Sequence, residues 1–381
     1  MIYDADVHFC VRHFFDELKE KHPRFVEFYN ESCRTIDLDK IWCQCYENVK
    51  DSDWPKCSSR DDFYQLPAHI KSTLQNRLEN EKLIQIIDGV LCVDHYENHC
   101  PDLDTTLTSM KLLGVDKQSL TPYPPFSLMF YQTDSQLAVD LMRCWNDRIW
   151  EISQKHQEFN PVAWVALQDK EASQQELEKI AARGFSAVYV NDDCLSAFTP
   201  ELWWVFELCE KLDIPIFLHP TKYNPYPLPW MQDTNEKYQL MREQFPSPLQ
   251  YWKVNIMGLV TEGVLDKFPN LKLIIAEHGL KWVPEICRFM TANKWPNPLP
   301  YFKKNFWFTT EPDEEKFLLL AGLVGWDRLL FGSDYPHNDF GGMNRYNDAD
   351  LLNSFLTEKK ISQEQYDLIT HKNYISLRNA G

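Results

Sequence analysis

Carboxylates and histidines stand at four places in the chain where a short apolar run ends. The four groups are Asp6-Val7-His8, His219-Pro220, Glu277-His278-Gly279 and Ser333-Asp334-Tyr335-Pro336-His337. Imidazole nitrogens and carboxylate oxygens bind divalent metal ions in proteins, and the same groups carry protons in acid–base catalysis. Residues two apart on a strand, such as Asp6 and His8, point to the same side of the sheet. The types and spacing therefore predict a metal or proton-transfer centre.

Eight short runs with strand character must position these side chains. The predicted strands are Ile2–His8, Lys117–Pro122, Asn160–Leu167, Phe185–Asn191, Ile214–His219, Leu271–Glu277, Phe306–Thr310 and Arg328–Ser333. The helical stretches predicted between them are Ser135–Gln157, Ala172–Arg183, Pro200–Leu212, Trp252–Phe268, Trp282–Ala292, Asp313–Leu323 and Ala349–Thr357. Alternation of this kind is typical of a parallel α/β protein. Eight units predict a (β/α)8 TIM barrel, in which the carboxyl ends of the strands form the catalytic face.

Two segments are longer than this repeat requires. We expect residues 9–101 to form a helical cap inserted after the first strand, with the barrel built from residues 1–8 and 102–381. Thr221–Pro248 follows the fifth strand and is rich in proline and aromatic residues, which predicts a surface loop rather than a helix. In that loop Tyr223 and Trp230 are candidate substrate contacts.

Arg345, after the eighth strand, is a candidate clamp for a substrate carboxylate. An ordinary surface arginine is the alternative. The pair His95 and His99 lies in the inserted segment, and there we expect a loop or cap contact rather than a pair of metal ligands.

The D-x-H, H-P, E-H-G and G-S-D-Y-P-H elements, in this order, resemble the amidohydrolase-related, aminocarboxymuconate-semialdehyde decarboxylase-like family of metal-dependent barrels. The resemblance covers the first strand and most of residues 100–381, including Trp145-Asn146-Asp147 and residues 263–269. It implies that Asp6, His8, His219 and Asp334 bind a divalent metal ion. It also implies that His278 polarises the substrate or transfers a proton beside that ion.

The sequence departs from the decarboxylases of this family in two ways. Its first motif is Asp-x-His rather than the His-x-His of several members, which favours harder ions such as Mn²⁺ or Fe²⁺ over zinc. Glu277 and His337 add donors beyond those one ion needs, which suggests two metal ions. The alternative is that Glu277 or His337 orients a ligand. Since Glu277 and His278 are adjacent, their side chains should point to opposite sides unless the strand bends or ends there.

Two enzymatic hypotheses follow. The first is a dinuclear Fe or Mn/Fe oxygenase, similar to some members of the family, in which Asp6, His8, His219, Glu277, Asp334 and His337 hold two ions that use O2 on a small or peptidic substrate. The alternative is a mononuclear decarboxylase or hydrolase of a carboxylated aromatic or enol-type substrate, with Zn²⁺ as a possible ion. His278 and Glu277 are the catalytic candidates of the site, and in the mononuclear alternative His278 moves the proton. A third hypothesis is a catalytically inactive scaffold or partner subunit that keeps the barrel but not the reaction.

The composition excludes some partners. The 381 residues include 39 Lys and Arg against 56 Asp and Glu, a net charge of −17, which argues against nucleic acid as a partner. The longest apolar run, Phe317–Trp326, is too short to cross a bilayer. The chain shows no secretory signal, and the odd number of 11 cysteines favours reduced thiols. We therefore expect a cytoplasmic enzyme, and its oligomeric state stays open.

Overall fold

A computed structural model describes most of the chain outside the predicted insertion. The described residues are 1–9, 114–122, 134–192, 194–220, 235–246, 250–312, 316–335 and 348–379, with the strand residues 85–87 and 90–92 and a few helical positions between 103 and 111. The fold and the site below are those of these residues.

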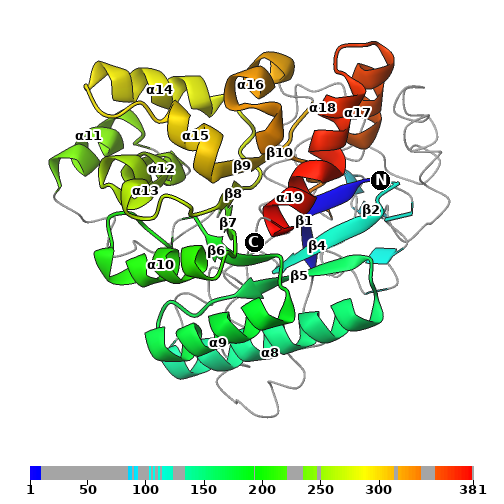
Figure 1. The fold of residues 1–381 in the computed structure, drawn as a ribbon, viewed down its shortest axis with the longest axis horizontal. Helices are drawn as coiled ribbons and strands as arrows, with labels where there is room; N and C mark the ends of the chain where they lie inside the picture. Colours follow the sequence, from blue (N-terminus) through cyan, green and yellow to red (C-terminus); the bar gives the residue numbers. More distant parts are fainter. Residues whose placement is uncertain are drawn as a thin grey trace.

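Eight parallel strands form one sheet that curves into a barrel (Figure 1). In sheet order they are β1 (Tyr3–Phe9), β4 (Lys117–Pro122), β5 (Phe159–Trp164), β6 (Ala187–Asn191), β7 (Ile216–His219), β8 (Leu273–Ile275), β9 (Phe306–Thr309) and β10 (Leu329–Leu330). Backbone hydrogen bonds from Ala5 to Phe331 (2.8 Å) and from His8 to Tyr335 (2.7 Å) join the first strand to the last. The predicted (β/α)8 barrel is confirmed. Lys117–Pro122 has the predicted bounds, and the other seven predicted strands are present in shortened or slightly shifted form.

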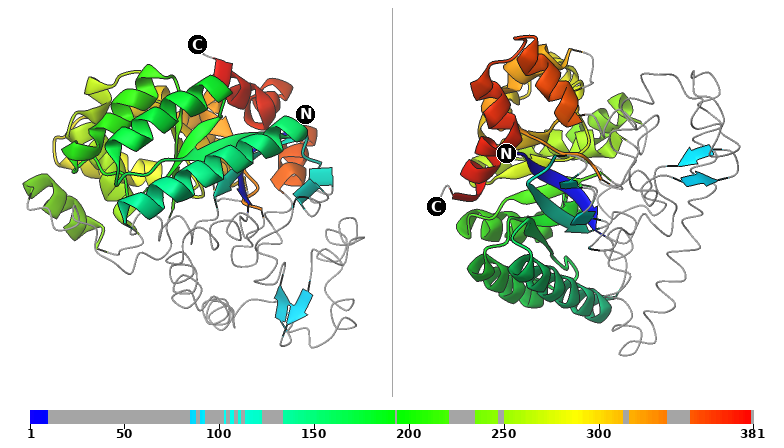
Figure 2. Two further views of the ribbon diagram at one scale, coloured as in Figure 1. Left: turned by 90° about the horizontal axis from the view of Figure 1, so that it is seen from below. Right: turned by 90° about the vertical axis from the view of Figure 1, so that its right-hand side faces the viewer.

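Helices cover the outside of this sheet, as two further views show (Figure 2). They are α8 (Ser135–Lys155), α9 (Lys170–Arg183), α10 (Trp203–Lys211), α11 (Glu236–Gln244), α12 (Tyr251–Thr261), α13 (Val264–Lys267), α14 (Trp282–Ala292), α15 (Leu299–Asn305), α16 (Phe317–Val324), α17 (Asp348–Thr357), α18 (Gln363–Asp367) and α19 (Asn373–Asn379). Side-chain caps fix where several of them begin: Asp134 accepts from the backbone N–H of Leu137, and Asp169 from that of Ala172.

The structure corrects the prediction of a loop over Thr221–Pro248, because α11 lies in its second half. The Asn235 side chain accepts from the backbone N–H groups of Lys237 and Tyr238 and so caps this helix. The prolines that argued against a helix all lie outside Glu236–Gln244. Helices α15, α18 and α19 were also not predicted. In the inserted segment the named elements are an antiparallel pair, β2 (Gln85–Ile87) and β3 (Val90–Cys92). The helical cap and the domain boundaries stay predictions.

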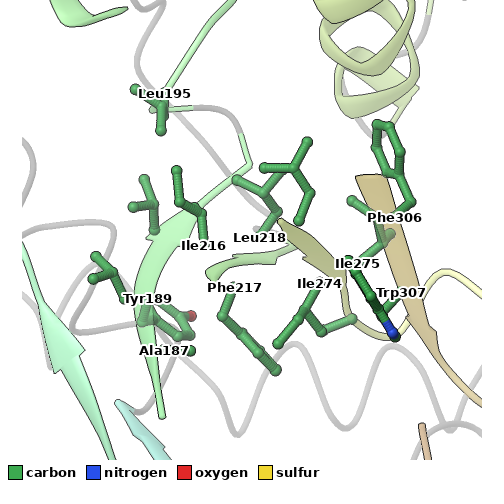
Figure 3. Close-up of a cluster of buried hydrophobic side chains, with 14 of the residues drawn as sticks. Ala187, Tyr189, Leu195, Ile216, Phe217, Leu218, Ile274, Ile275, Phe306 and Trp307 are labelled. Atoms are coloured by element: carbon green, nitrogen blue, oxygen red, sulfur yellow. The ribbon is translucent and has the colours of Figure 1, made fainter. Parts of the chain in front are cut away.

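Large apolar side chains fill the sheet interior at one level (Figure 3). Tyr189, Phe217, Ile274 and Trp307 lie opposite one another on four successive strands and are all buried. Because side chains alternate along a strand, the residues two positions further on point to the same side. On β7 that residue is His219, so the apolar layer forms the floor on which the polar strand ends stand.

The described residues contain no helix both long and apolar enough to cross a membrane. Four described cysteines, Cys144, Cys194, Cys209 and Cys287, are free thiols. The cytoplasmic location stays a prediction.

Candidate metal centre

Four side chains from three strand ends converge at the carboxyl-terminal mouth of the barrel. Asp6 and His8 come from β1, His219 ends β7, and Glu277 follows β8; each offers a donor atom within 4.8 Å of the other three. His8 Nε2 lies 2.9 Å from Glu277 Oε1 and 2.9 Å from Asp334 Oδ1, while His219 Nε2 lies 2.6 Å from Glu277 Oε1. We call Asp6, His8, His219, Glu277 and Asp334 the donor cluster.

The outer hydrogen bonds of both histidines determine which nitrogen faces the cluster. His219 Nδ1 lies 2.8 Å from the Pro220 carbonyl, which only accepts, so Nδ1 carries the proton. The Thr121 hydroxyl donates to the Val7 carbonyl and therefore accepts from His8 Nδ1, 3.0 Å away. In the neutral ring, each Nε2 then turns a lone pair toward carboxylate oxygens. Metal-bound histidines in proteins show this arrangement, in which the second nitrogen donates to a carbonyl or hydroxyl.

Asp6 supports the same interpretation. Its side chain is 1% exposed, and neither of its carboxylate oxygens has a hydrogen-bond partner in the part of the chain that the structure describes. A buried carboxylate without a partner is costly unless it is protonated or binds a cation. Together with lone pairs that face carboxylates, the unpartnered Asp6 fits a divalent metal ion bound among these side chains.

Without a metal ion, the pKa values of the cluster's side chains depend on burial and on their contacts with one another. Burial alone would lower the pKa of His8, but hydrogen bonds to Asp334 and Glu277 outweigh it and raise that pKa to about 10. Burial raises the pKa of Asp6 well above its usual range. Burial alone would raise the pKa of Glu277, but its interactions with His219 and His8 outweigh burial and hold that pKa well below its usual range. Burial also lowers the pKa of His219.

The backbone is strained at two members of the cluster. Glu277 has φ +52° and Asp334 has φ +55°, a left-handed conformation that side-chain-bearing residues rarely adopt. Such strain persists only where the surrounding structure enforces it, and it is concentrated at functional sites. Adjacent residues of a regular strand would point to opposite sides. At Glu277, β8 has already ended and the chain bends, so the Glu277 side chain turns into the cluster while His278 turns toward Asp192.

Gly332 and Asp4 hold the eighth strand end against the first. A Cβ on Gly332 would lie 2.9 Å from Thr309 Cβ and 3.2 Å from Asp6 Cβ, so only glycine allows this approach. The Asp4 carboxylate accepts from the Ser333 backbone N–H (2.9 Å) and hydroxyl (2.5 Å), next to Asp334 in the chain. Burial raises the pKa of Asp4 to about 7, against the lowering effect of those bonds. Sequence reasoning missed Asp4, although its spacing of two from Asp6 on the first strand was a usable signal.

His278 lies outside the donor cluster and has partners of its own. Its Nε2 is 2.8 Å from Asp192 Oδ2, and its ring stacks on Trp252 with centroids 3.6 Å apart and planes 14° from parallel. Asp192 directly follows β6, so it too stands at the carboxyl end of a strand. A strand end was predicted at Asn191, but no chemical role was predicted for Asp192.

Four predicted site residues cannot be placed. His337, Arg345, Tyr223 and Trp230 lie outside the described residues, so their proposed roles as ligand and substrate contacts stay predictions. The structure brings together the remaining predicted ligands, Asp6, His8, His219, Glu277 and Asp334, within one cluster.

Comparison with known proteins places this geometry in context. The sequence profile of a family described as amidohydrolase matches residues 85–373. The 2-amino-3-carboxymuconate-6-semialdehyde decarboxylase of Dictyostelium discoideum is 28% identical over 280 residues, which is 67% of this chain and 72% of the relative. A gamma-resorcylate decarboxylase of Polaromonas is 28% identical over 225 residues, 53% of this chain and 68% of the relative.

A solved structure shares the fold. The dihydroxybenzoic acid decarboxylase of Polaromonas, determined with bound manganese and the inhibitor 2-nitroresorcinol, is 20% identical, with a TM-score of 0.61 over 99% of this chain and 96% of that one. Both curated relatives are named as decarboxylases, so the sequence-based preference for a dinuclear iron or manganese–iron oxygenase is wrong. Surplus donors gave that preference, and surplus donors alone do not distinguish two ions from one ion with a crowded set of buried carboxylates.

Proposed function

This chain belongs to the amidohydrolase family, and we propose that it is a metal-dependent decarboxylase of carboxylated aromatic or enol-type acids. Similarity to two curated decarboxylases supports the reaction class. Both are named for carboxylated substrates, one aromatic and one a muconate semialdehyde, and this defines the substrate class to test first.

The observation that carries this proposal is the donor cluster with its inward lone pairs. We propose that Asp6, His8, His219 and Asp334 hold one divalent ion, and that Glu277, whose Oε1 contacts both histidines, contributes a third carboxylate. A donor set rich in carboxylate favours a hard ion such as Mn²⁺, with Zn²⁺ as the alternative. When bound, the ion acts as a Lewis acid toward the oxygens of a carboxylated substrate.

The residues of the chain then have separate tasks. The donor cluster fixes the position of the substrate carboxylate, while the strained backbone at Glu277 turns that side chain into the cluster and leaves His278 beside it, bound to Asp192. His278 supplies a proton to the carbon that carries the carboxylate. As the carbon–carbon bond breaks, CO2 leaves, its bonding electron pair stays on that carbon, and the proton takes its place. The balance needs no oxidant.

The test is a product assay with metal-depleted protein reconstituted with Mn²⁺ or Zn²⁺. The reconstituted protein is incubated under argon with 2,6-dihydroxybenzoate, with 2-amino-3-carboxymuconate-6-semialdehyde and with benzoate as the unactivated control. We expect CO2 and the matching decarboxylated product from at least one activated acid, and none from benzoate or from the metal-depleted protein. A product that forms only in the presence of O2, or equally without metal, would refute the proposal.

His278→Ala separates metal binding from proton transfer. Because His278 contacts Asp192 rather than the donor cluster, this variant should keep its metal content and lose about 10²-fold or more in kcat. Wild-type kcat in this variant would remove His278 from the mechanism while leaving the metal centre in place.

A further inference from the structure

A buried carboxylate and an imidazole meet across two strand ends beside the donor cluster. The Asp192 carboxylate, which follows β6, lies 2.8 Å from His278 Nε2, which follows β8, and the two side chains are 6% and 9% exposed. A carboxylate only accepts hydrogen bonds, so Nε2 of His278 donates. The neutral ring is thereby held in the tautomer with the proton on Nε2, and Nδ1 is the nitrogen that can exchange a proton.

Aromatic side chains fix the plane of the same ring. Trp252, in the first turn of α12, stacks on His278, and Trp282, at the start of α14, meets Trp252 edge to face with centroids 5.1 Å apart. The Trp282 indole N–H donates to the carbonyl of Gly279, one residue after His278. With Asp192 at one edge and Trp252 on one face, both the tilt and the rotation of the imidazole are constrained.

The segment that carries Asp192 is anchored independently of the Asp192 carboxylate. The buried Asn255 of α12 donates to the backbone carbonyls of Asp192 and Leu195, each at 2.8 Å, and accepts from the backbone N–H of Ala197. In addition, the Asp192 backbone N–H donates to the His219 carbonyl at 2.9 Å. A change confined to the Asp192 side chain therefore leaves the backbone of this segment in place.

From this geometry we propose that Asp192 is the positioning residue for His278. It holds the ring so that the imidazolium, protonated on both nitrogens, gives its Nδ1 proton to the substrate carbon and is left as the neutral tautomer with the proton on Nε2. The inference rests on the proposed function in one respect, namely that His278 supplies the proton. It gives a role in the reaction to the end of β6, a strand that contributes no residue to the donor cluster.

The test compares Asp192→Ala, Asp192→Asn and Asp192→Glu in the Mn²⁺-reconstituted protein. Alanine removes the acceptor, so we expect kcat to fall about 10- to 100-fold, with KM within about threefold and the metal content unchanged. Asparagine keeps the shape and one oxygen acceptor for Nε2–H, so its loss of kcat should be smaller than that of alanine. Because its amide can also present an N–H to Nε2, its kcat should stay below that of wild type. Glutamate restores a carboxylate and should recover part of the lost kcat.

Asp147→Ala is the matched control. Asp147 is also a paired aspartate, bound to Lys179 at 2.7 Å and to Arg183 at 2.5 Å, but it lies on α8 outside the barrel. Its kcat should stay within about twofold of wild type. If Asp192→Ala also stays within twofold while His278→Ala is impaired, Asp192 has no positioning role and the inference is overturned.

The imidazole itself gives a readout that does not depend on activity. In ¹⁵N-histidine-labelled protein, His278, identified by comparison with His278→Ala, should show a protonated Nε2 and an unprotonated Nδ1. In Asp192→Ala this pattern should change to a mixture of tautomers. If wild type decarboxylates no acid tested, the proposed function fails, and these spectra still decide the inference: an unchanged His278 pattern in Asp192→Ala would overturn it.

Discussion

Two buried polar groups in this barrel differ in how their hydrogen bonds are completed. Between α8, β5 and α9, the Asn146 side chain donates to the Trp164 carbonyl (3.1 Å) and to Glu176 Oε1 (3.2 Å), and it accepts from the Trp164 backbone N–H (2.8 Å). Glu176 also accepts from Lys179. We call Asn146 and Glu176 with these partners the amide network. In this network each donor named above faces an acceptor of the protein, so no bound ion is needed.

The donor cluster at the barrel mouth is not completed in that way. The Nδ1 atoms of both imidazoles are already used, so Nε2 of His219, and of His8 when its ring is neutral, faces carboxylate oxygens with no proton to donate. Among the described residues, the Asp6 oxygens have no hydrogen-bond partner. Since buried polar groups are normally paired, such an arrangement marks a place where a cation belongs. If the donor cluster has the functional role proposed above and the amide network only a structural one, the two should respond differently to the same perturbation.

The largest expected effect is on activity, from removing one imidazole of the donor cluster. His219→Ala deletes a donor that contacts Glu277, so metal binding should weaken strongly and decarboxylation should fall by at least about 10³-fold. Elemental analysis together with a CO2 assay checks this. Normal metal content in His219→Ala would mean that the ion, if one binds, is held elsewhere.

The amide network should show the opposite pattern. Asn146→Ala leaves the Trp164 backbone groups without their side-chain partner inside the protein, so we expect a loss of about 3 kcal/mol in the free energy of unfolding. Urea denaturation measures this loss. The metal content and kcat of the folded variant should equal those of wild type, and a parallel loss of metal would break the distinction between the two groups.

Metal removal should destabilise the protein through the donor cluster alone. At a free Mn²⁺ concentration 100 times Kd, binding stabilises the folded state by about 2.7 kcal/mol, because the unfolded chain has no assembled site. Thermal melts before and after chelation give the shift. It should be equal in wild type and Asn146→Ala and absent in His219→Ala; a shift that persists in His219→Ala would argue for a different site.

A smaller effect is expected from pH. In the metal-free protein the pKa of His8 is raised to about 10, so Nε2 carries a proton at pH 7 that must leave before a metal ion binds. Affinity should therefore rise with pH, by up to tenfold, or about 1.4 kcal/mol, per unit for one released proton. Calorimetric titrations with Mn²⁺ between pH 6.5 and 8.5 in buffers of different ionisation enthalpy measure the released protons. Affinity that is flat over this range would contradict the protonated state of His8.

The strands and most ligands could be predicted because both follow local rules. Short runs of β-type residues indicated all eight barrel strands, and the polar residues at their ends had to meet at one face of a barrel. This rule predicted Asp6, His8, His219, Glu277 and Asp334, which the structure brings together. Helix α11 was missed because the proline-rich composition of the first half of Thr221–Pro248 was taken to hold for the whole segment. The helix lies in the proline-free part that follows the Asn235 cap.

The partners of the predicted residues could not be derived from local patterns. Asp192 and His278 are 86 residues apart, and their contact depends on how far the chain continues beyond β6 and β8 before it turns. The reaction was also out of reach, since the number of donors in a sequence does not determine how many ions they hold. The similarity to decarboxylases, rather than the donor count, corrected the oxygenase reading.

Anomalous diffraction from crystals soaked in Mn²⁺ tests the central claim most directly, namely that the donor cluster is built for a cation. We expect one strong manganese peak per chain, bonded to His8 Nε2, His219 Nε2 and an Asp6 oxygen, with both Nδ1 hydrogen bonds retained. A map without that peak, in which His8 still contacts Glu277 and Asp334 directly after the soak, would contradict it.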